Sequence, residues 1–276
     1  MTPSTLEIDL RRRVAVVRLA RERVRNAFDE TSIAELTAAF TALGADPEVR
    51  AIVLAARGPA FCAGADLEWM RKMAGYSFEE NRADAGRLAA MLATLASCPK
   101  PVIARVHGDA FAGGVGLVAA CDLVVASEEA NFCLSEVKLG LIPATIAPYV
   151  IRAMGARQAQ RYFLTAERFS AARAREIGLV HEVTPAARLD DTIEDWLTAL
   201  LSASGEAVSS AKQLVAAVAG RAIDEALIAE TVERIASARA SADGREGVAS
   251  FLEKRKPRWL REFEAEQAAL NDEEEM

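Results

Sequence analysis

The fold is decided by two short glycine-bearing stretches, Phe61-Cys62-Ala63-Gly64-Ala65-Asp66 and Phe111-Ala112-Gly113-Gly114-Val115-Gly116. Each stretch follows an extended apolar run and leads into a helical pattern. Backbone N–H groups at such strand-to-helix turns have no partner inside the helix, so they can point at a common anion. We therefore expect the two turns to supply the two amide donors of an oxyanion hole.

Apolar strands and amphipathic helices alternate on both sides of these turns. Two short extended runs joined by three arginines predict a hairpin, and the next helix is expected to begin at Asp29 and end near Gly44. The unbroken apolar run 51–56 predicts a strand that is covered on both faces. The predicted strands are residues 6–10, 14–19, 51–56, 101–106 and 123–126. This order predicts an α/β core without an internal linker.

After about Pro143 the helical periodicity dominates, and the strand signal shrinks to Leu179–Val183. Amphipathic helices are predicted around 163–164 and at 171–177, 193–201 and 222–238. Such helices bury their apolar faces on the α/β core or, in an oligomer, on a neighbouring subunit. The acidic run from Asn271 to Met276 predicts a frayed tail.

The composition is that of an ordinary soluble protein. The 276 residues are 51% hydrophobic, which is enough to bury one sizeable core. A formal net charge of -7 argues against a general affinity for nucleic acid. The apolar runs fall far short of the roughly 20 residues that cross a bilayer, and no secretory pattern follows the N-terminal arginines. We expect a cytoplasmic protein that does not contact membranes.

One carboxylate is a candidate acid or base. Glu136 ends the apolar run 132–136, and such a setting raises a carboxyl pKa toward the range useful for proton transfer. The alternative is a solvated surface glutamate. His107 and His181 are the only histidines, and the four cysteines lie in apolar surroundings without metal-ligand spacing, which predicts structural roles. The turns also lack the phosphate-binding spacings GxxxxGKS/T and GxGxxG.

Several collinear motifs together resemble the enoyl-CoA hydratase/isomerase (crotonase) superfamily over nearly the whole chain. They are Arg25-Asn26-Ala27-Phe28, residues 61–70 and 107–122 with the two turns, and residues 136–143, 176–180 and 246–259. The resemblance implies a spiral of ββα units in residues 1–200, a helical oligomerisation region in 201–265 and an acidic tail in 266–276. It also implies an acyl-CoA substrate, no separate cofactor or metal, and a homotrimer or a dimer of trimers.

The resemblance assigns roles to individual residues. It implies that the amides of Ala65 and Gly113 hold the thioester oxygen. The adenine and pantetheine path is implied to be lined by Arg25, Ala27, Ala63, Asp66 and Leu67. Phe251 and Lys254 are implied to reach the CoA of an adjacent subunit, whereas a solvated helix end is the other interpretation of the basic cluster 254–256. The acyl pocket is expected to be walled by Trp69, Met70, Met73, Phe111 and Gly114, with ordinary core packing as the alternative.

The chain departs from the family pattern at one position. Typical hydratases carry one glutamate in the helix after the second turn and one at the place of Glu136, and this chain has Gly116 at the first of these places. Two carboxylates in a site of low dielectric constant repel each other strongly. We expect Gly116 to remove that charge and to make room for a branched substrate that carries its own carboxylate, with Glu136 as the remaining acid–base group.

Local runs favour one subgroup. Residues 113–117, 133–136, 141–146 and 161–169 resemble bacterial 3-methylglutaconyl-CoA hydratases of leucine breakdown and isohexenylglutaconyl-CoA hydratases of acyclic-terpene breakdown. The favoured hypothesis is hydration of 3-methylglutaconyl-CoA to 3-hydroxy-3-methylglutaryl-CoA. The alternatives are the isohexenyl substrate, a general enoyl-CoA hydratase or isomerase, and a catalytically silent CoA-binding or assembly protein. For the distal carboxylate the sequence offers Arg71, Lys72, Arg82 and Arg87 and does not select among them.

Overall fold

A β-hairpin forms one edge of the main sheet. The computed structural model describes residues 4–274, and in it β1 (Leu6–Arg11) pairs antiparallel with β2 (Val14–Leu19). Arg12 and Arg13 close the hairpin with φ values of 49° and 63°. Two successive left-handed residues give a turn whose twist matches that of the strands. The predicted hairpin is confirmed.

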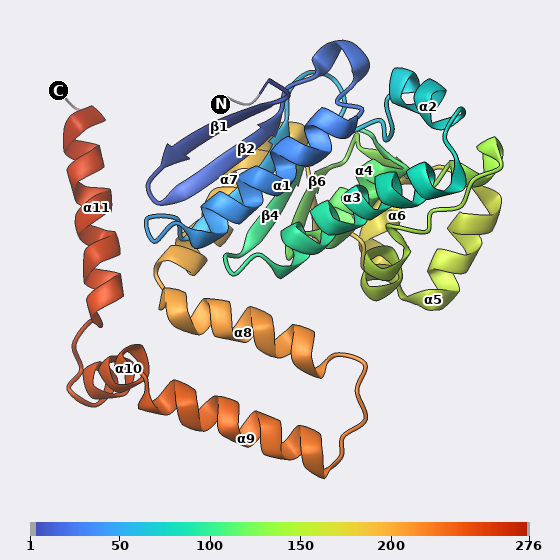
Figure 1. Ribbon diagram of the computed structural model, residues 1–276. Helices are drawn as coiled ribbons and strands as arrows, with labels where there is room; N and C mark the ends of the chain where they lie inside the picture. The colour runs from blue at the N-terminus through green and yellow to red at the C-terminus, as the bar shows by residue number, and fades with distance from the viewer. Residues whose placement is uncertain (1–3, 275–276) are drawn as a thin grey trace. The chain divides into compact units, whose positions relative to one another are not determined.

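The main sheet has six strands in the order β1-β2-β3-β4-β6-β9, parallel from β2 onward (Figure 1). The later strands are β3 (Ala51–Ala56), β4 (Val102–Val106), β6 (Leu123–Ser127) and β9 (Glu182–Thr184). The last strand begins three residues later than Leu179, where the sequence predicted it. The N–H groups of Leu179 and Val180 instead close the end of α6 (Ala171–Glu176) on the carbonyl of Ala174, with Gly178 at φ +87°.

A second, smaller sheet has the order β5-β7-β8 and was not predicted. Its strands are β5 (Ala110–Phe111), β7 (Asn131–Cys133) and β8 (Phe169–Ser170). β5 and β7 run parallel, and β8 is antiparallel to β7. Strands of two or three residues are too short for an alternation of apolar and polar residues to reveal them.

Helices α1 (Glu30–Ala45) and α3 (Phe78–Ser97) cover one face of the main sheet (Figure 1). α1 begins where predicted, because the Asp29 side chain accepts the Ser32 N–H and caps it. α1 packs along α3, and the two lie side by side over the sheet in Figure 1. Three further helices are α2 (Leu67–Met73), α4 (Gly113–Ala120) and α5 (Ala147–Thr165). The 3-10 turns are η1 (Glu22–Val24), η2 (Glu136–Leu139) and η3 (Ala186–Arg188).

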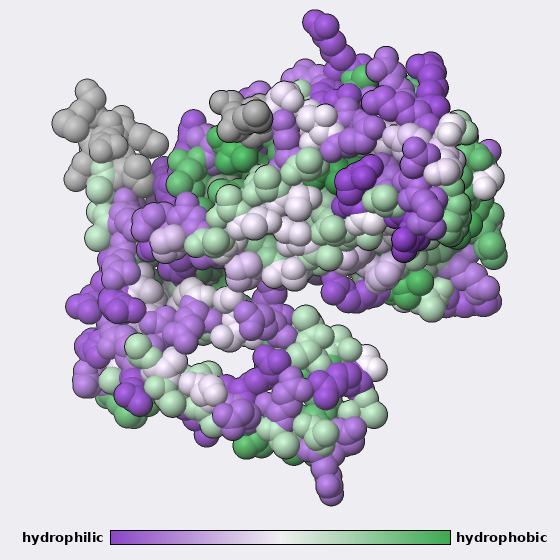
Figure 2. Space-filling view, in the orientation of Figure 1, coloured by the Kyte–Doolittle hydropathy of each residue, from purple (hydrophilic) through white to green (hydrophobic). Residues whose placement is uncertain are grey.

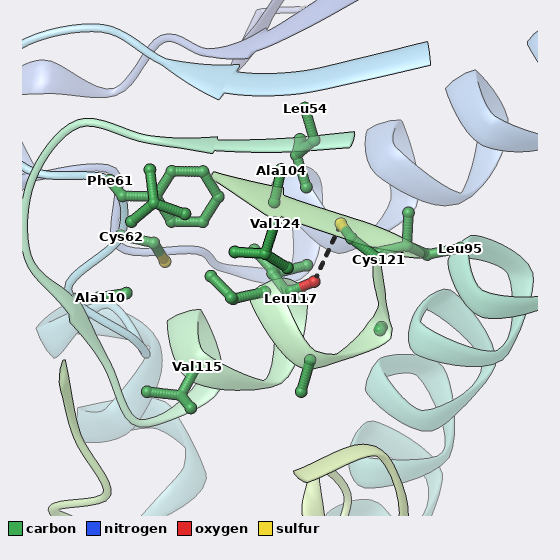
Figure 3. Close-up of a cluster of buried hydrophobic side chains, with 14 of the residues drawn as sticks. Leu54, Phe61, Cys62, Leu95, Ala104, Ala110, Val115, Leu117, Cys121 and Val124 are labelled. Carbon is green, nitrogen blue, oxygen red and sulfur yellow. Dashed lines mark hydrogen bonds between the residues drawn. The ribbon is translucent and has the colours of Figure 1, made fainter. Parts of the chain in front are cut away.

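The hydrophobic core continues beneath both glycine turns. Figure 3 shows Val115 and Leu117 of α4 among side chains of the main sheet and of the turn segments. Cys121 donates from its thiol to the Leu117 carbonyl at 3.3 Å. All four cysteines are free and buried, as predicted. The turns therefore rest on a packed base that fixes their backbone.

The chain divides into two compact units, residues 1–194 and 195–276. The division falls inside α7 (Leu189–Leu201), whereas the sequence suggested a boundary at residue 200. The second unit contains α8 (Gly205–Val218), α9 (Glu225–Ala240), α10 (Ala242–Leu252) and α11 (Arg258–Glu274). Figure 2 shows hydrophobic residues at the surface of α9, where Ile228, Val232 and Ile235 are each at least half exposed.

The acidic end of the chain differs from the expectation of a frayed tail. α11 continues through Glu274, so the acidic run is helical as far as residue 274, and Glu275 and Met276 lie outside the described residues. The run 266–274 contains neither proline nor glycine and is rich in strong helix formers, which accounts for its helical conformation. Among residues 4–274 no helix is long and apolar enough to cross a membrane.

Candidate active site

The two glycine turns lie against each other. The Phe111 N–H donates to the Cys62 carbonyl at 2.9 Å, and Cys62 forms a parallel bridge with Ala110. A Cβ on Gly64 would lie 3.0 Å from the Phe111 carbonyl oxygen and 3.7 Å from the Gly113 nitrogen, and Gly64 has φ +92°. Position 64 needs glycine for its left-handed φ and for this close approach.

Each turn leaves at least one backbone amide without an acceptor. Phe28 pairs with Ala65 by donating its N–H to the Gly64 carbonyl at 2.9 Å and accepting the Asp66 N–H at 3.0 Å. In such a bridge the N–H of Ala65 itself points away from Phe28. Gly113 is the first residue of α4, so its N–H has no acceptor inside the helix. Within the described part of the chain neither amide donates a hydrogen bond. This pair fits the predicted oxyanion hole.

A strained residue sets the direction of the Gly113 amide. Ala112 has φ 47° and ψ -118°, a conformation that costs a residue with a side chain on the order of 1–3 kcal/mol. Its N–H donates to the Cys133 carbonyl at 2.7 Å, and its carbonyl accepts the Val115 N–H at 2.9 Å. These bonds hold the outlier in place, and it turns the chain from β5 into α4 within one residue.

Close packing excludes side chains at the two positions that follow. A Cβ on Gly113 would lie 2.3 Å from Phe28 Cζ, and one on Gly114 would lie 2.5 Å from the Cys62 carbonyl oxygen. Phe28 is 2% exposed, and its ring centroid lies 6.0 Å from that of Trp69. Phe28 therefore supports the Gly113 amide, a role that the sequence analysis missed. Its only signal was membership of the Arg25–Phe28 motif.

Glu136 follows β7 at the same edge of the small sheet. Phe111 lies opposite Cys133 in the parallel pair of β5 and β7; Gly113 comes two residues after Phe111, and Glu136 three after Cys133. Oε2 of Glu136 is buried and has no hydrogen-bond partner among the residues described. Burial raises the pKa of the Glu136 carboxyl, opposed by its own backbone N–H. The direction agrees with the expectation for an apolar setting.

The space beside Gly116 is filled. A Cβ on Gly116 would lie 2.2 Å from Ile146 Cγ2 and 2.8 Å from Ile146 Cβ. Ile146 is 2% exposed and directly precedes α5. The expectation that Gly116 makes room for a substrate branch is therefore wrong, because Ile146 occupies that room. Position 116 still lacks a carboxylate, and the apolar side chain of Ile146 fills the space beside it.

The residues expected along the CoA path come together at the first turn. The Ala63 N–H donates to the Arg25 carbonyl at 3.0 Å. The Ala27 carbonyl accepts a hydrogen bond from Arg21, and Leu67 is 69% exposed at the start of α2. Arg25 has a left-handed φ of 51°, which lets the chain bend toward the turn. The sequence therefore grouped these segments correctly, and their contact with CoA stays a prediction.

Asp66 has a structural task in addition to the expected one. Its carboxylate accepts the Glu68 N–H at 2.7 Å, which caps α2, and it pairs with Arg21 at 3.1 Å. Burial works against the charge of Asp66, but these donors outweigh it and lower the pKa of the carboxyl. The side chain is therefore committed to holding the first turn on α2.

The expected walls of the acyl pocket divide into two groups. Trp69 is 3% exposed and belongs to the core, where its indole N–H lies 3.4 Å from Asp84 Oδ1, so the core alternative applies to it. Met70 and Met73 are half-buried on α2. Phe111 is half-buried at the end of β5, directly before the second turn. Of the four side chains, Phe111 is the one that the sheet register ties to the free Gly113 amide.

The remaining sequence candidates have clear local settings. Phe251 is 82% exposed near the end of α10, and Lys254 follows that helix with φ 55°. Their predicted role toward a neighbouring subunit stays a prediction. His181 Nδ1 accepts the Val124 N–H at 3.0 Å, and His107 Nε2 lies 2.8 Å from the Gly58 carbonyl oxygen. Both histidines serve the structure, as predicted.

Comparisons with known proteins agree with this geometry. Residues 9–262 match the family model described as enoyl-CoA hydratase/isomerase. A solved enoyl-CoA hydratase from Shewanella pealeana is 44% identical with a TM-score of 0.90, and the match covers 93% of this chain and 96% of that chain. One from Mycobacterium smegmatis is 38% identical with a TM-score of 0.88, covering 92% and 98%. A Thermus thermophilus protein assigned as an enoyl-CoA hydratase is 34% identical over 89% of this chain and 97% of its own length.

Proposed function

Because the chain belongs to the enoyl-CoA hydratase/isomerase family, we propose that it hydrates 3-methylglutaconyl-CoA to 3-hydroxy-3-methylglutaryl-CoA. The chain has the crotonase fold, and its general activity is that of an enzyme of the enoyl-CoA hydratase type. The observation that carries the finer proposal is the half-buried carboxylate of Glu136, whose buried Oε2 has no partner among the described residues and which follows the sheet edge that also presents the Gly113 amide.

The chemistry follows from these groups. The amides of Ala65 and Gly113 bind the thioester oxygen and stabilise the charge that develops on it, and each such donor contributes on the order of a hundredfold or more in rate. The ionised Glu136 removes a proton from water as the water oxygen bonds to C3, and it returns this proton to C2 when the enolate collapses. One water is added across C2 and C3, and Glu136 is ionised again at the end.

The preference for an acidic acyl group rests on charge. Two like charges about 4 Å apart repel by about 4 kcal/mol at an effective dielectric constant of about 20. A second glutamate at position 116 would impose such a penalty on a substrate carboxylate, whereas Gly116 packed by Ile146 presents apolar atoms. This arrangement favours a substrate that brings its own carboxylate.

We further propose that CoA runs along the first turn past Arg25, Ala27, Ala63, Asp66 and Leu67, and that Phe251 and Lys254 reach the CoA of the next subunit of a homotrimer. Ile228, Val232 and Ile235 support an oligomer, because they recur on one side of α9 and are 51%, 59% and 50% exposed in the single chain. An apolar stripe of this kind usually marks a contact surface.

The test is an activity screen of the purified protein on crotonyl-, 3-methylcrotonyl-, 3-methylglutaconyl- and isohexenylglutaconyl-CoA, with water uptake followed by mass spectrometry. We expect the highest kcat/KM for 3-methylglutaconyl-CoA. Glu136→Gln should lower it by about a hundred- to ten-thousandfold, since the group both takes and gives the proton. Unchanged turnover in Glu136→Gln would refute the single-carboxylate mechanism, and double-bond migration without water uptake would show an isomerase instead.

A further inference from the structure

The side chains of Phe111, Cys133 and Arg168 form one row across the small sheet. Phe111 of β5 lies opposite Cys133 of β7, and Phe132 of β7 lies opposite Phe169 of β8 in the antiparallel pair. Continuing this register by one residue places Arg168 opposite Cys133. The Cys133 thiol also donates to the carbonyl of Ala166 at 3.4 Å, which confirms that this segment passes Cys133. The backbone of Arg168 therefore lies at the same edge of the small sheet as the Gly113 amide and Glu136.

The Arg168 side chain reaches back across this row. Neighbouring strands lie about 4.8 Å apart, so the row spans about 10 Å from β5 to β8. Cζ of Arg168 nevertheless lies 4.8 Å from the centroid of the Phe111 ring. The guanidinium is thus held over the strand that leads into the oxyanion turn.

Three charges at this edge act on the Cys133 thiol. Burial raises the pKa of the Cys133 thiol; Lys138 and Arg168 act in the opposite direction, and Glu136 adds to the rise. Both cations and the candidate catalytic carboxylate therefore lie within electrostatic range of the same thiol. An anion bound in this region would meet Arg168 and Glu136 together.

Arg168 differs from its neighbours in having no acidic partner. Arg161 pairs with Glu167 at 2.6 Å, and Arg173 pairs with Glu176 at 2.8 Å. Arg168 is exposed, and among the residues that the structure describes it forms no ion pair. A guanidinium stacked on an aromatic ring keeps its edge N–H groups available for a carboxylate.

The basic residues suggested by the sequence are less suited. Lys72 pairs with Glu30 at 3.4 Å, Arg82 with Glu79 at 2.9 Å and Arg87 with Asp84 at 2.5 Å. Arg71 lies on α2 and not in the row.

We propose that Arg168 receives the distal carboxylate of a dicarboxylic acyl-CoA, at a subsite built by Phe111, Cys133 and Arg168. This inference rests on the proposed function, because it supplies the group that recognises the second acid. The Ala65 and Gly113 amides hold the thioester end, Glu136 faces the reacting carbons, and Arg168 binds the far end. Lys138, two residues after Glu136 in η2, is the competing cation at this edge.

The experiment compares kcat/KM for 3-methylglutaconyl-CoA and crotonyl-CoA, which lacks the second acid, in wild type and in Arg168→Gln, Arg168→Lys, Lys138→Gln and Arg161→Gln. Arg161 is the matched control, since it also stacks on an aromatic ring, at 5.3 Å from Tyr162. Arg168→Gln should lower the ratio of kcat/KM for 3-methylglutaconyl-CoA to kcat/KM for crotonyl-CoA by about five- to fiftyfold. This range lies between the effects of removing an exposed and a buried charge pair. Arg168→Lys should restore part of it, and added salt should reduce the wild-type ratio.

The outcomes separate this proposal from the function on which it rests. A wild-type enzyme that prefers crotonyl-CoA would refute the proposed substrate, and the subsite with it, before any variant is compared. If wild type prefers the dicarboxylic thioester, an equal fall of kcat/KM for both substrates in Arg168→Gln would refute the subsite alone. Arg168 would then only support the turn that follows Phe111. A selective loss in Lys138→Gln or Arg161→Gln instead of Arg168→Gln would also overturn it.

Discussion

Because Ile146 packs against Gly116, we predict that Gly116→Ala destabilises the wild-type protein but not a variant that lacks the Ile146 side chain. In Gly116→Ala the new Cβ would lie 2.2 Å from Ile146 Cγ2, at least about 1.2 Å closer than ordinary contact, which begins at 3.4 Å. Ile146 is 2% exposed, and its carbonyl accepts the Val150 N–H at 3.1 Å, so it has little freedom to retreat. Overpacking of this kind costs about 1–3 kcal/mol.

Removing Ile146 should release that penalty. The variant must be Ile146→Gly, because alanine would keep its Cβ at 2.8 Å from the new Cβ, whereas glycine leaves only Cα, at 3.8 Å. Ile146→Gly alone should lose at least about 2–5 kcal/mol, the cost of a truncation to alanine, because it leaves a cavity. In this background Gly116→Ala should cost nothing or stabilise α4 by up to about 1 kcal/mol, the usual gain of alanine over glycine inside a helix. The coupling energy of the cycle is therefore about 1–4 kcal/mol in favour of the double variant.

Urea unfolding of the four proteins measures these differences, provided that the m-values agree. Gly86→Ala is the matched control, since Gly86 lies in α3 and a Cβ there would meet nothing within 4 Å. It should stabilise both backgrounds by the same amount, up to about 1 kcal/mol. If Gly116→Ala stabilises the wild type as Gly86→Ala does, or if its cost is equal with and without the Ile146 side chain, then Ile146 does not exclude a side chain at position 116.

Three further predictions concern Glu136 and Ala112. The acid limb of kcat/KM should lie above pH 4.5, the ordinary pKa of a glutamate, because burial raises the pKa of Glu136 and the reaction needs the ionised form; a limb at or below pH 4.5 would contradict this. Because the pKa of Glu136 is raised, the folded state binds the proton more tightly than the unfolded state, and the wild type should lose stability as the pH rises from 4.5 through the folded pKa. In urea titrations the stability of Glu136→Gln relative to wild type should therefore increase over this pH window. A constant difference between the two proteins would refute the linkage. Ala112→Gly should raise the unfolding free energy by about 1 kcal/mol by relieving its positive φ, and a loss in the same assay would refute the strain.

The main sheet was predictable because its signal is local. The Leu6–Leu19 hairpin and the strand at Ala51–Ala56 carry apolar residues at spacings that no helix period explains. Asp29 marks a helix start by its own side chain. The small sheet carries no such signal, because its strands have two or three residues and take their register from the segments beside them.

The same division holds in the site. The glycine turns and Glu136 were found because glycine spacing and a carboxylate in an apolar run are visible in the sequence. The roles of Phe28 and Ile146 arise only from tertiary packing, since each fills the space that a distant glycine leaves. The row that contains Arg168 depends on the register of three strands from three separate segments.

Backbone and side chains divide the work of this site in a way that bears on how its specificity can change. The oxyanion amides belong to the backbone, so exchanging a side chain does not remove them. A substitution at Phe28 or at the strained Ala112 can only shift their positions. In the proposed mechanism, proton transfer and selection of the acyl group rest on side chains instead. Position 116 and Ile146 are coupled by direct contact, so a carboxylate can return to 116 only when residue 146 becomes smaller. In the proposed subsite Arg168 would act through its charge at an exposed edge, without a packing partner of this kind that must change with it. We therefore expect acid recognition to be altered by one substitution, and the number of catalytic carboxylates only by two.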